Sequence, residues 1–346
     1  MQKALLVKEI GKPLSLGTRP IPKPKARKVV VKVTAAQVLP HDTASRDKGL
    51  FISNHLPSVP AHNIAGIVQE LGPDVTEYSI GQHIYGQGDP LAVTPDQCGL
   101  QEFAILPTNM SAPVPDNFSD DQMVTLPINA TTIFCALFHQ NWLGFPAPFS
   151  PESKTFDYGK QKLVIIGGNS NCGRFAIQFA KMVGIGTIIA IASLSGEQEL
   201  KTMGASHVID RYSQTIVKEV QEICGGEEEV THVVDTVTYD FDLAMEMVAT
   251  HCPSSIAVLH VADVTAQLEK RGKKWGRGSG VSGWKNNFDE ETGKLYWESL
   301  GKWVQEGKIL IPKFRVIEGL DEVLVNEALD SYIGHKPVVQ AVIHPR

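Results

Sequence analysis

A buried strand that ends at a glycine pair constrains this sequence more than any other feature. The strand spans Lys162 to Ile166, and the turn Gly167-Gly168-Asn169-Ser170-Asn171-Cys172-Gly173 joins it to an amphipathic helix at Arg174–Val183. A strand, glycine turn and helix in this order point free backbone N–H groups and a helix N-terminus at an anion such as a pyrophosphate. The segment therefore predicts a dinucleotide site.

Short strands and helices alternate after this turn. Strands are predicted at Thr187–Ala192, His207–Asp210, His232–Asp235 and Ser255–His260, and helices at Glu197–Met203, Ser213–Ile223 and Phe241–Thr250. Alternation of this kind is typical of a parallel, doubly wound sheet with helices on both faces. The fold class predicted for this half is α/β.

The part of the chain before residue 125 has a different hydrophobic pattern. Short β-branched runs, such as Lys28 to Val33 and Ile64 to Leu71, are separated by Gly and Pro turns and indicate a mainly β unit. A chain of 346 residues with 42% hydrophobic residues can fill two cores. Neither a helical nor a strand-like hydrophobic period is present in Trp142–Gly159 or in Arg271–Gly293. The first of these segments is predicted to be a surface connection between the domains.

Charge and hydropathy exclude several classes of partner. A formal charge of −6 and a pI near 6.0 leave no basic excess for nucleic acid. Lys3, Lys8 and Glu9 interrupt the apolar residues of the N-terminal segment, and no apolar run is long enough to cross a bilayer, so we expect a cytoplasmic protein without membrane contact. Five scattered cysteines read as reduced thiols.

The glycine turn matches the G-x-G-x-x-G pattern in part. Gly168 and Gly173 fall at its outer positions, and Ser170 takes the middle one. The predicted cofactor contacts in the turn are Gly167, Gly168, Asn169, Ser170, Asn171, Cys172 and Gly173. A purely structural turn is the alternative.

Ser193, at the end of the second strand, distinguishes between the two nicotinamide cofactors. An NAD site usually has Asp or Glu there, whereas a serine leaves room and hydrogen bonds for a 2′-phosphate, which favours NADPH. Further phosphate contacts are predicted from Ser195, Lys201 and Arg211, although each could equally be an ordinary surface residue. The neighbouring Glu197 and Glu199 oppose this assignment.

Several landmarks give the chain a resemblance to the medium-chain dehydrogenase/reductase superfamily. They are Pro60-Ala61-His62-Asn63-Ile64-Ala65-Gly66, Tyr78-Ser79-Ile80-Gly81-Gln82-His83-Ile84-Tyr85-Gly86, Leu126-Pro127 with Thr131-Thr132, and the glycine turn. The resemblance implies a GroES-like, mainly β catalytic domain at residues 1–128 and 310–346, with a Rossmann cofactor domain at residues 129–309.

The same resemblance implies an enzyme without metal. The zinc ligands of the superfamily's alcohol dehydrogenases align with Leu39, His62 and Ile128, of which two are aliphatic. The four-cysteine structural-zinc lobe also lacks a counterpart, since only Cys98 lies in that region. We therefore expect no zinc, and a structural His62 satisfied by hydrogen bonds.

Within the superfamily, the chain resembles zinc-free quinone oxidoreductases and the trans-acting enoyl reductases of fungal polyketide pathways. This implies NADPH-dependent hydride transfer to an activated C=C bond of an enone or enoyl thioester, or to a quinone, in secondary metabolism. Thr132 is expected beside the nicotinamide, and His41 and Asp42 are the other catalytic candidates, although the latter two could instead fix a loop. Phe51 stands where some relatives have a proton-donating tyrosine, so water or substrate could supply the proton.

Other interpretations stay open at this point. The scaffold could serve a zinc-independent alcohol or carbonyl oxidoreductase, a pathway enzyme with a non-reductive step, or a catalytically silent NADPH-binding module. The expected substrate is a small molecule or a carrier-bound acyl group, for which Ser279–Trp284 and Phe288 could line a channel. A monomer and a homodimer are both compatible with the sequence.

Overall fold

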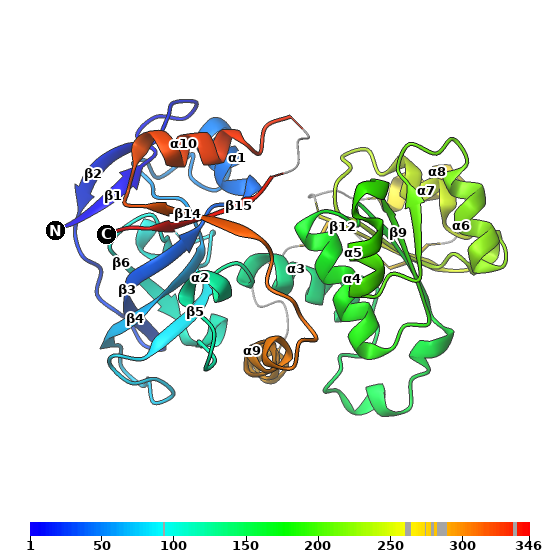
Figure 1. Ribbon diagram of the computed structural model, residues 1–346, viewed down its shortest axis with the longest axis horizontal. Coiled ribbons are helices and arrows are strands. Elements are labelled where there is room, and N and C mark those ends of the chain that lie inside the picture. The colour runs from blue at the N-terminus through cyan, green and yellow to red at the C-terminus, as the bar shows by residue number, and fades with distance from the viewer. Residues whose placement is uncertain (93, 260–263, 274, 278–279, 282–288, 335–337) are drawn as a thin grey trace. The chain divides into compact units, whose positions relative to one another are not determined.

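The computed structural model describes residues 1–346 except 93, 260–263, 274, 278–279, 282–288 and 335–337 (Figure 1). Two compact units make up the chain: the first combines Met1–Ile128 with Trp284–Arg346, and the second is Asn129–Gly283. The division after Ile128 falls where the sequence placed it, whereas the return to the first unit comes at residue 284 and not at 310.

The first unit is built on a mixed seven-stranded sheet in the order β14-β15-β3-β4-β5-β7, with β6 also paired to β3. Its strands are β3 (Lys28–Gln37), β4 (Asn63–Leu71), β5 (His83–Gln87), β6 (Phe103–Pro107), β7 (Ser111–Pro113), β14 (Phe314–Glu318) and β15 (Gln340–His344). A separate antiparallel pair joins β1 (Gln2–Leu6) to β2 (Ser15–Arg19). The strand β3 is central because its β-branched run is almost wholly buried and pairs on both sides.

Four α-helices accompany this sheet in the described part of the first unit: α1 (Pro40–Lys48), α2 (Asp120–Met123), α9 (Glu290–Gln305) and α10 (Glu322–Asp330). The helix α9 explains the difference in domain bounds. Its Trp297 is buried and lies edge-on to the ring of Tyr85 on β5, with 6.2 Å between ring centroids. A Cβ on Gly301 would lie 3.0 Å from Pro115. The helix α9, which the resemblance assigned to the Rossmann domain, therefore packs with the first unit.

The second unit contains a six-stranded sheet, parallel throughout, in the order β10-β9-β8-β11-β12-β13. Its strands are β8 (Lys162–Ile166), β9 (Thr187–Ala192), β10 (His207–Asp210), β11 (His232–Asp235), β12 (Ser254–Val258) and β13 (Trp275–Arg277). The helices are α3 (Pro127–Phe138), α4 (Asn171–Val183), α5 (Glu197–Met203), α6 (Ile216–Cys224), α7 (Asp242–Met247) and α8 (Thr265–Lys270). The predicted doubly wound α/β sheet is confirmed.

Continuous apolar runs explain why β8 and β9 occupy the middle of this sheet. Ile165 and Ile189 are fully buried, as expected for strands that helices cover on both faces. The strand β13 was not predicted, since it lies within the segment 271–293 that the sequence indicated as irregular.

The segment Trp142–Gly159 lies wholly within the second unit and does not link the two units, contrary to the sequence-based prediction. It is also partly buried: Trp142, Phe145 and Tyr158 are each less than a tenth exposed. The ring of Phe145 lies 4.6 Å from that of His232 on β11. Its aromatic residues therefore belong to the core of the second unit.

None of the helices that the structure describes combines the length and the hydropathy required to cross a bilayer.

Candidate functional site

The glycine turn after β8 is fixed to the neighbouring strand. The N–H groups of Gly167 and Gly168 both donate to the carbonyl of Ile191 on β9, each at 3.0 Å. Gly167 has a φ of 82°, a left-handed conformation that glycine adopts without steric cost. Ser170 then caps α4, since its Oγ accepts the N–H of Gly173 at 2.9 Å.

Two glycines of the turn, Gly168 and Gly173, let the helix α4 approach the neighbouring strands. A Cβ on Gly173 would lie 2.3 Å from the carbonyl oxygen of Gly167, and a Cβ on Gly168 would lie 2.9 Å from the Cβ of Ala190. Gly173 is thus required by the backbone of the turn itself, before any question of contact with a pyrophosphate arises.

The start of α4 is the candidate contact for a pyrophosphate. Asn171 and Cys172 form its first residues, so their N–H groups precede the first intrahelical bonds and the helix dipole adds positive potential. The Cys172 thiol is no nucleophile at neutral pH, because burial raises its pKa to about 12. Its Sγ lies 3.6 Å from Asn129 Oδ1.

Sequence reasoning missed Thr236 in this site. The Thr236 Oγ1 lies 2.8 Å from Ser170 Oγ and donates to the carbonyl of Ile166 at 2.8 Å, which ties β8, β11 and the start of α4 together. Thr236 could have been predicted from its position directly after β11, because the carboxyl ends of parallel strands meet at one edge of the sheet.

The residues predicted to contact a 2′-phosphate gather beyond the end of β9, with one exception. Asn169 Nδ2 donates to the carbonyl of Ser193 at 2.9 Å, and the hydroxyls of Ser193 and Ser195 lie 3.0 Å apart. The backbone N–H of Arg211 donates to the carbonyl of Ala192 at 2.9 Å, so this arginine follows β10 beside Ser193. The hydroxyl pair and the backbone of Arg211 therefore share one edge, while the Arg211 guanidinium lies over the ring of Tyr212, 4.6 Å from its centroid.

Lys201 is the exception. It pairs with Glu197 one turn earlier on α5, at 2.7 Å, and no described contact joins it to Ser193. Glu199 pairs with Arg174 at 2.7 Å. The two acids that opposed phosphate binding are thus each paired with a cation.

Thr132, the remaining candidate in the second unit, is buried on α3.

The first unit holds the other catalytic candidates. His41 and Asp42 lie in the first turn of the helix α1, not on a loop. Asp42 is fully buried, and its two carboxylate oxygens accept the backbone N–H groups of Leu39 and Ala61, each at 2.8 Å. It therefore fixes the start of α1 to the chain before β4, as in the loop-fixing alternative, and acts as a positioning residue.

His62 is less satisfied than predicted. Its Nε2 lies 3.5 Å from Cys98 Sγ, but its buried Nδ1 has no hydrogen-bond partner. Burial lowers the pKa of His62 to about 4, which the charge of Asp42 offsets only in part, so the imidazole is neutral. The ring of His41 lies 5.6 Å from that of His62, a proximity that the sequence did not indicate.

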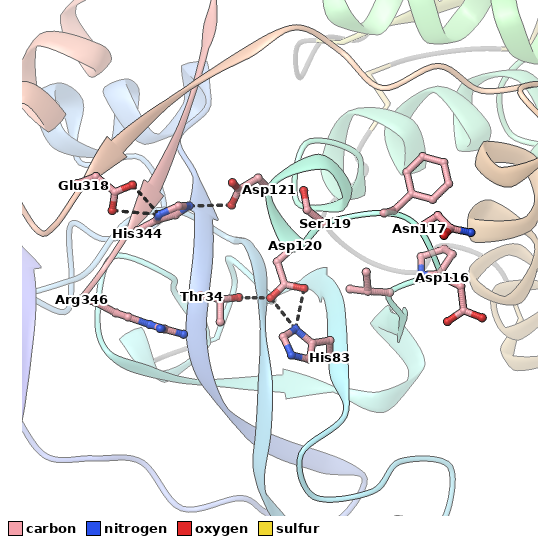
Figure 2. Close-up of a pocket in the computed structure, with 13 residues that line it drawn as sticks. Thr34, His83, Asp116, Asn117, Ser119, Asp120, Asp121, Glu318, His344 and Arg346 are labelled. Atoms are coloured by element: carbon pink, nitrogen blue, oxygen red, sulfur yellow. Dashed lines mark hydrogen bonds and ion pairs between the residues drawn. The ribbon is translucent and has the colours of Figure 1, made fainter.

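A separate pocket of about 690 Å³ in the first unit contains none of the predicted site residues (Figure 2). Its ionisable groups pair with one another: His83 Nδ1 lies 2.9 Å from Asp120, and His344 bridges Asp121 at 2.7 Å and Glu318 at 3.1 Å. These pairs join α2 to β5, β14 and β15. The network is therefore a structural one.

Two family models match the chain, one in each unit. The alcohol dehydrogenase GroES-like domain matches residues 25–116, and the zinc-binding dehydrogenase family matches residues 172–256. The first unit thus carries a GroES-like domain and the second a Rossmann-like domain. This chain belongs to the medium-chain dehydrogenase/reductase superfamily.

Individual relatives agree with this assignment. The chain is 30% identical to a trans-enoyl reductase of Aspergillus japonicus over 56% of this chain and 55% of the relative. It spans just over half the length of the first curated relatives it matches. A quinone oxidoreductase from Coxiella burnetii has the same fold, with a TM-score of 0.74, 23% identity, and 100% and 99% coverage of the two chains. A mycobacterial protein solved with NADPH gives a TM-score of 0.76, 20% identity and full coverage of both.

The superfamily's catalytic zinc does not fit this chain. Leu39 and Ile128, which align with two of its ligands, are buried aliphatic residues without a donor atom in the side chain. The region matched by the zinc-binding family model contains none of the three aligned positions.

Proposed function

We propose that this chain is an NADPH-dependent oxidoreductase that transfers hydride to an activated acceptor and needs no catalytic zinc. The observation that carries the proposal is the edge beyond β8 and β9. There the glycine turn and the start of α4 suit a pyrophosphate, and Ser193, Ser195 and Arg211 suit a 2′-phosphate. A carboxylate at position 193 would repel that phosphate.

The class of hydride acceptor is inferred from the finding that the aligned residues do not fit a catalytic zinc. A carbonyl needs a metal or strong donors to polarise it, whereas an enone, an enoyl thioester or a quinone accepts hydride without such help. Among these, the trans-enoyl reductase relatives favour an enoyl thioester, free or bound to a carrier, in a polyketide pathway. The aliphatic residues Leu39 and Ile128, which cannot bind zinc, support an acceptor that needs no metal.

NADPH, when bound, supplies the hydride from its nicotinamide ring. The chain's own residues hold the cofactor and manage the proton. We assign Thr132 to the nicotinamide carboxamide and His41 to delivery of the proton to the α-carbon, with Asp42 fixing the helix turn that carries His41. Because His41 Nε2 is buried and turned toward Asp42, Nδ1 is the nitrogen assigned to proton delivery.

Calorimetry with NADPH and NADH on metal-stripped protein tests the cofactor assignment. Enones, quinones and enoyl thioesters are then added while the absorbance of the reduced cofactor is followed. We expect tighter binding of NADPH and its oxidation by one acceptor class. Binding of NADPH without turnover would favour a silent binding module or a non-reductive step, and no binding of either cofactor would overturn the site.

A further inference from the structure

Two imidazoles and a carboxylate converge in the first unit without a role in cofactor binding. His41 Nε2 lies 3.5 Å from Asp42 Oδ1, and His62 Nδ1 lies 3.9 Å from the same oxygen. All three atoms fall within 4.8 Å of one another. Their side chains are 12%, 0% and 6% exposed, so the group is enclosed.

Neither imidazole nitrogen has a hydrogen-bond partner. An unpaired buried polar atom costs about 1–3 kcal/mol, and such atoms are rare in folded proteins. Here two of them face a single carboxylate oxygen from different segments, α1 and the chain just before β4. One occupant could satisfy both nitrogens.

The charge of the group indicates which occupant fits. Asp42 is fully buried, and it contacts two backbone N–H groups and the two histidines. Among the described residues, no lysine or arginine forms an ion pair with it. An imidazole nitrogen without a hydrogen-bond partner can serve as a metal ligand. A buried carboxylate without an ion-paired lysine or arginine is stabilised by a cation.

We propose that His41 Nε2, Asp42 Oδ1 and His62 Nδ1 bind one divalent transition-metal ion, with Zn²⁺ as the fitting example. Bonds of about 2.0–2.2 Å place the ligand atoms of tetrahedral zinc about 3.4 Å apart, close to the 3.5 and 3.9 Å separations. Two histidines and one carboxylate form a known zinc ligand set with an open fourth position.

This site shares His62 with the position that aligns with the superfamily's catalytic zinc, but its other two ligands come from the first turn of α1, and neither Leu39 nor Ile128 takes part. The ion clamps α1 to the segment before β4. The ion shares His41 with the proposed reduction but is not required for it, since the reduction proceeds in metal-stripped protein.

Metal binding to the full-length protein tests the site. Metal-stripped protein is titrated with Zn²⁺ by calorimetry, and with Co²⁺ while its visible absorption is recorded. We expect one ion per chain, a tetrahedral Co²⁺ spectrum and a raised Tm. His41→Ala and His62→Gln should each weaken binding at least 100-fold, and the matched control His207→Ala, which removes an exposed imidazole of the second unit, should leave it unchanged.

Absence of stoichiometric binding, or equal affinity in the wild type and both ligand variants, overturns the site. His41 is the more exposed of the two histidines, so His41→Ala disturbs the core less than His62→Gln does. Unchanged circular dichroism verifies that the His41→Ala variant is folded. NADPH oxidation by the metal-stripped protein is a separate readout. The metal-binding test therefore stays valid if the proposed function fails, and the test of the proposed function stays valid if no metal binds.

Discussion

Ser193 ends β9 with a short hydroxyl at the point where a carboxylate would exclude a phosphate. Its oxygen lies 3.0 Å from that of Ser195, and Arg211 follows the adjacent strand. We expect Ser193→Asp to raise the dissociation constant for NADPH at least tenfold, which is about 1.4 kcal/mol, and that for NADH less than threefold. Calorimetry with both cofactors measures the two constants.

The matched control is Ser193→Asn, which has the shape of aspartate without its charge. It should weaken NADPH binding less than Ser193→Asp does, because only the charge repels the phosphate. Equal losses of both cofactors in Ser193→Asp would contradict the assignment of the 2′-phosphate to this edge.

Gly173 is constrained by contact distance and not by φ. A Cβ would lie 2.3 Å from the carbonyl oxygen of Gly167, so the turn or the helix must shift in Gly173→Ala. We expect a loss of about 1–3 kcal/mol in the free energy of unfolding of the second unit, together with loss of NADPH binding. Denaturant unfolding and calorimetry measure these effects.

Gly159→Ala serves as its control, since the nearest atom to that Cβ is a side-chain oxygen of Asp157 at 3.3 Å. A Gly173→Ala variant with normal stability and normal NADPH affinity would show that the turn tolerates a side chain.

At the residue scale, the sequence predicted those side chains whose role depends on neighbours along the chain. The glycine turn between β8 and α4 is of this kind, although α4 begins at Asn171, three residues before the predicted start, with Ser170 as its cap. The pairing of His62 with Cys98 and the approach of His41 to His62 could not be predicted, because they depend on how a helix and a strand fold against each other. Periodicity carries no such information.

His344 connects three elements of the first unit, since it belongs to β15 and contacts Glu318 on β14 and Asp121 on α2 (Figure 2). Partial burial lowers its pKa, but the hydrogen bonds and charges of Asp121 and Glu318 outweigh this and raise the pKa above its usual value. The stabilisation is therefore complete below the unfolded value, about 6.5, and is lost as the pH rises through the folded value.

We expect His344→Gln to lower the free energy of unfolding by a few tenths to about 1 kcal/mol at pH 6, and by less at pH 9. Urea unfolding at the two pH values measures the difference. His207→Gln, at an exposed histidine that hydrogen-bonds Ser206, should show no comparable pH dependence. A loss that grows as the pH rises would contradict the sign of the linkage.

At the scale of elements, the strongest patterns were predicted at the correct bounds, and irregular segments were not. The strands β8 to β11 and the helix α5 match their expected ranges because each has a clear period and a turn at its end. The strand β13 has three residues, too few to show a period. The helix α9 packs with the first unit through Trp297, a tertiary contact that helical spacing alone does not assign to a domain.

The predicted channel residues Ser279, Trp284 and Phe288 lie outside the described part of the chain.

Across the whole molecule, the two units divide the chemistry between them: the second presents the turn and the phosphate edge, and the first holds His41 and Asp42. Binding of NADPH to the native state alone should raise its free energy of unfolding by about 2.7 kcal/mol at a concentration of 100 times the dissociation constant. This stabilisation should appear first where the cofactor contacts backbone.

Hydrogen exchange with and without NADPH locates that stabilisation. We expect the largest protection in residues 166–174 and 192–196, because these segments form the positions proposed for the pyrophosphate and the 2′-phosphate, and no change in the β1–β2 pair of the first unit. Protection centred instead on the Asp120 and His344 pocket would move the cofactor site to the first unit, since that pocket also offers His83 and Arg346 to an anion. The mutual pairing of its histidines with carboxylates makes that outcome unfavourable, as an anion would have to displace those carboxylates before it could bind.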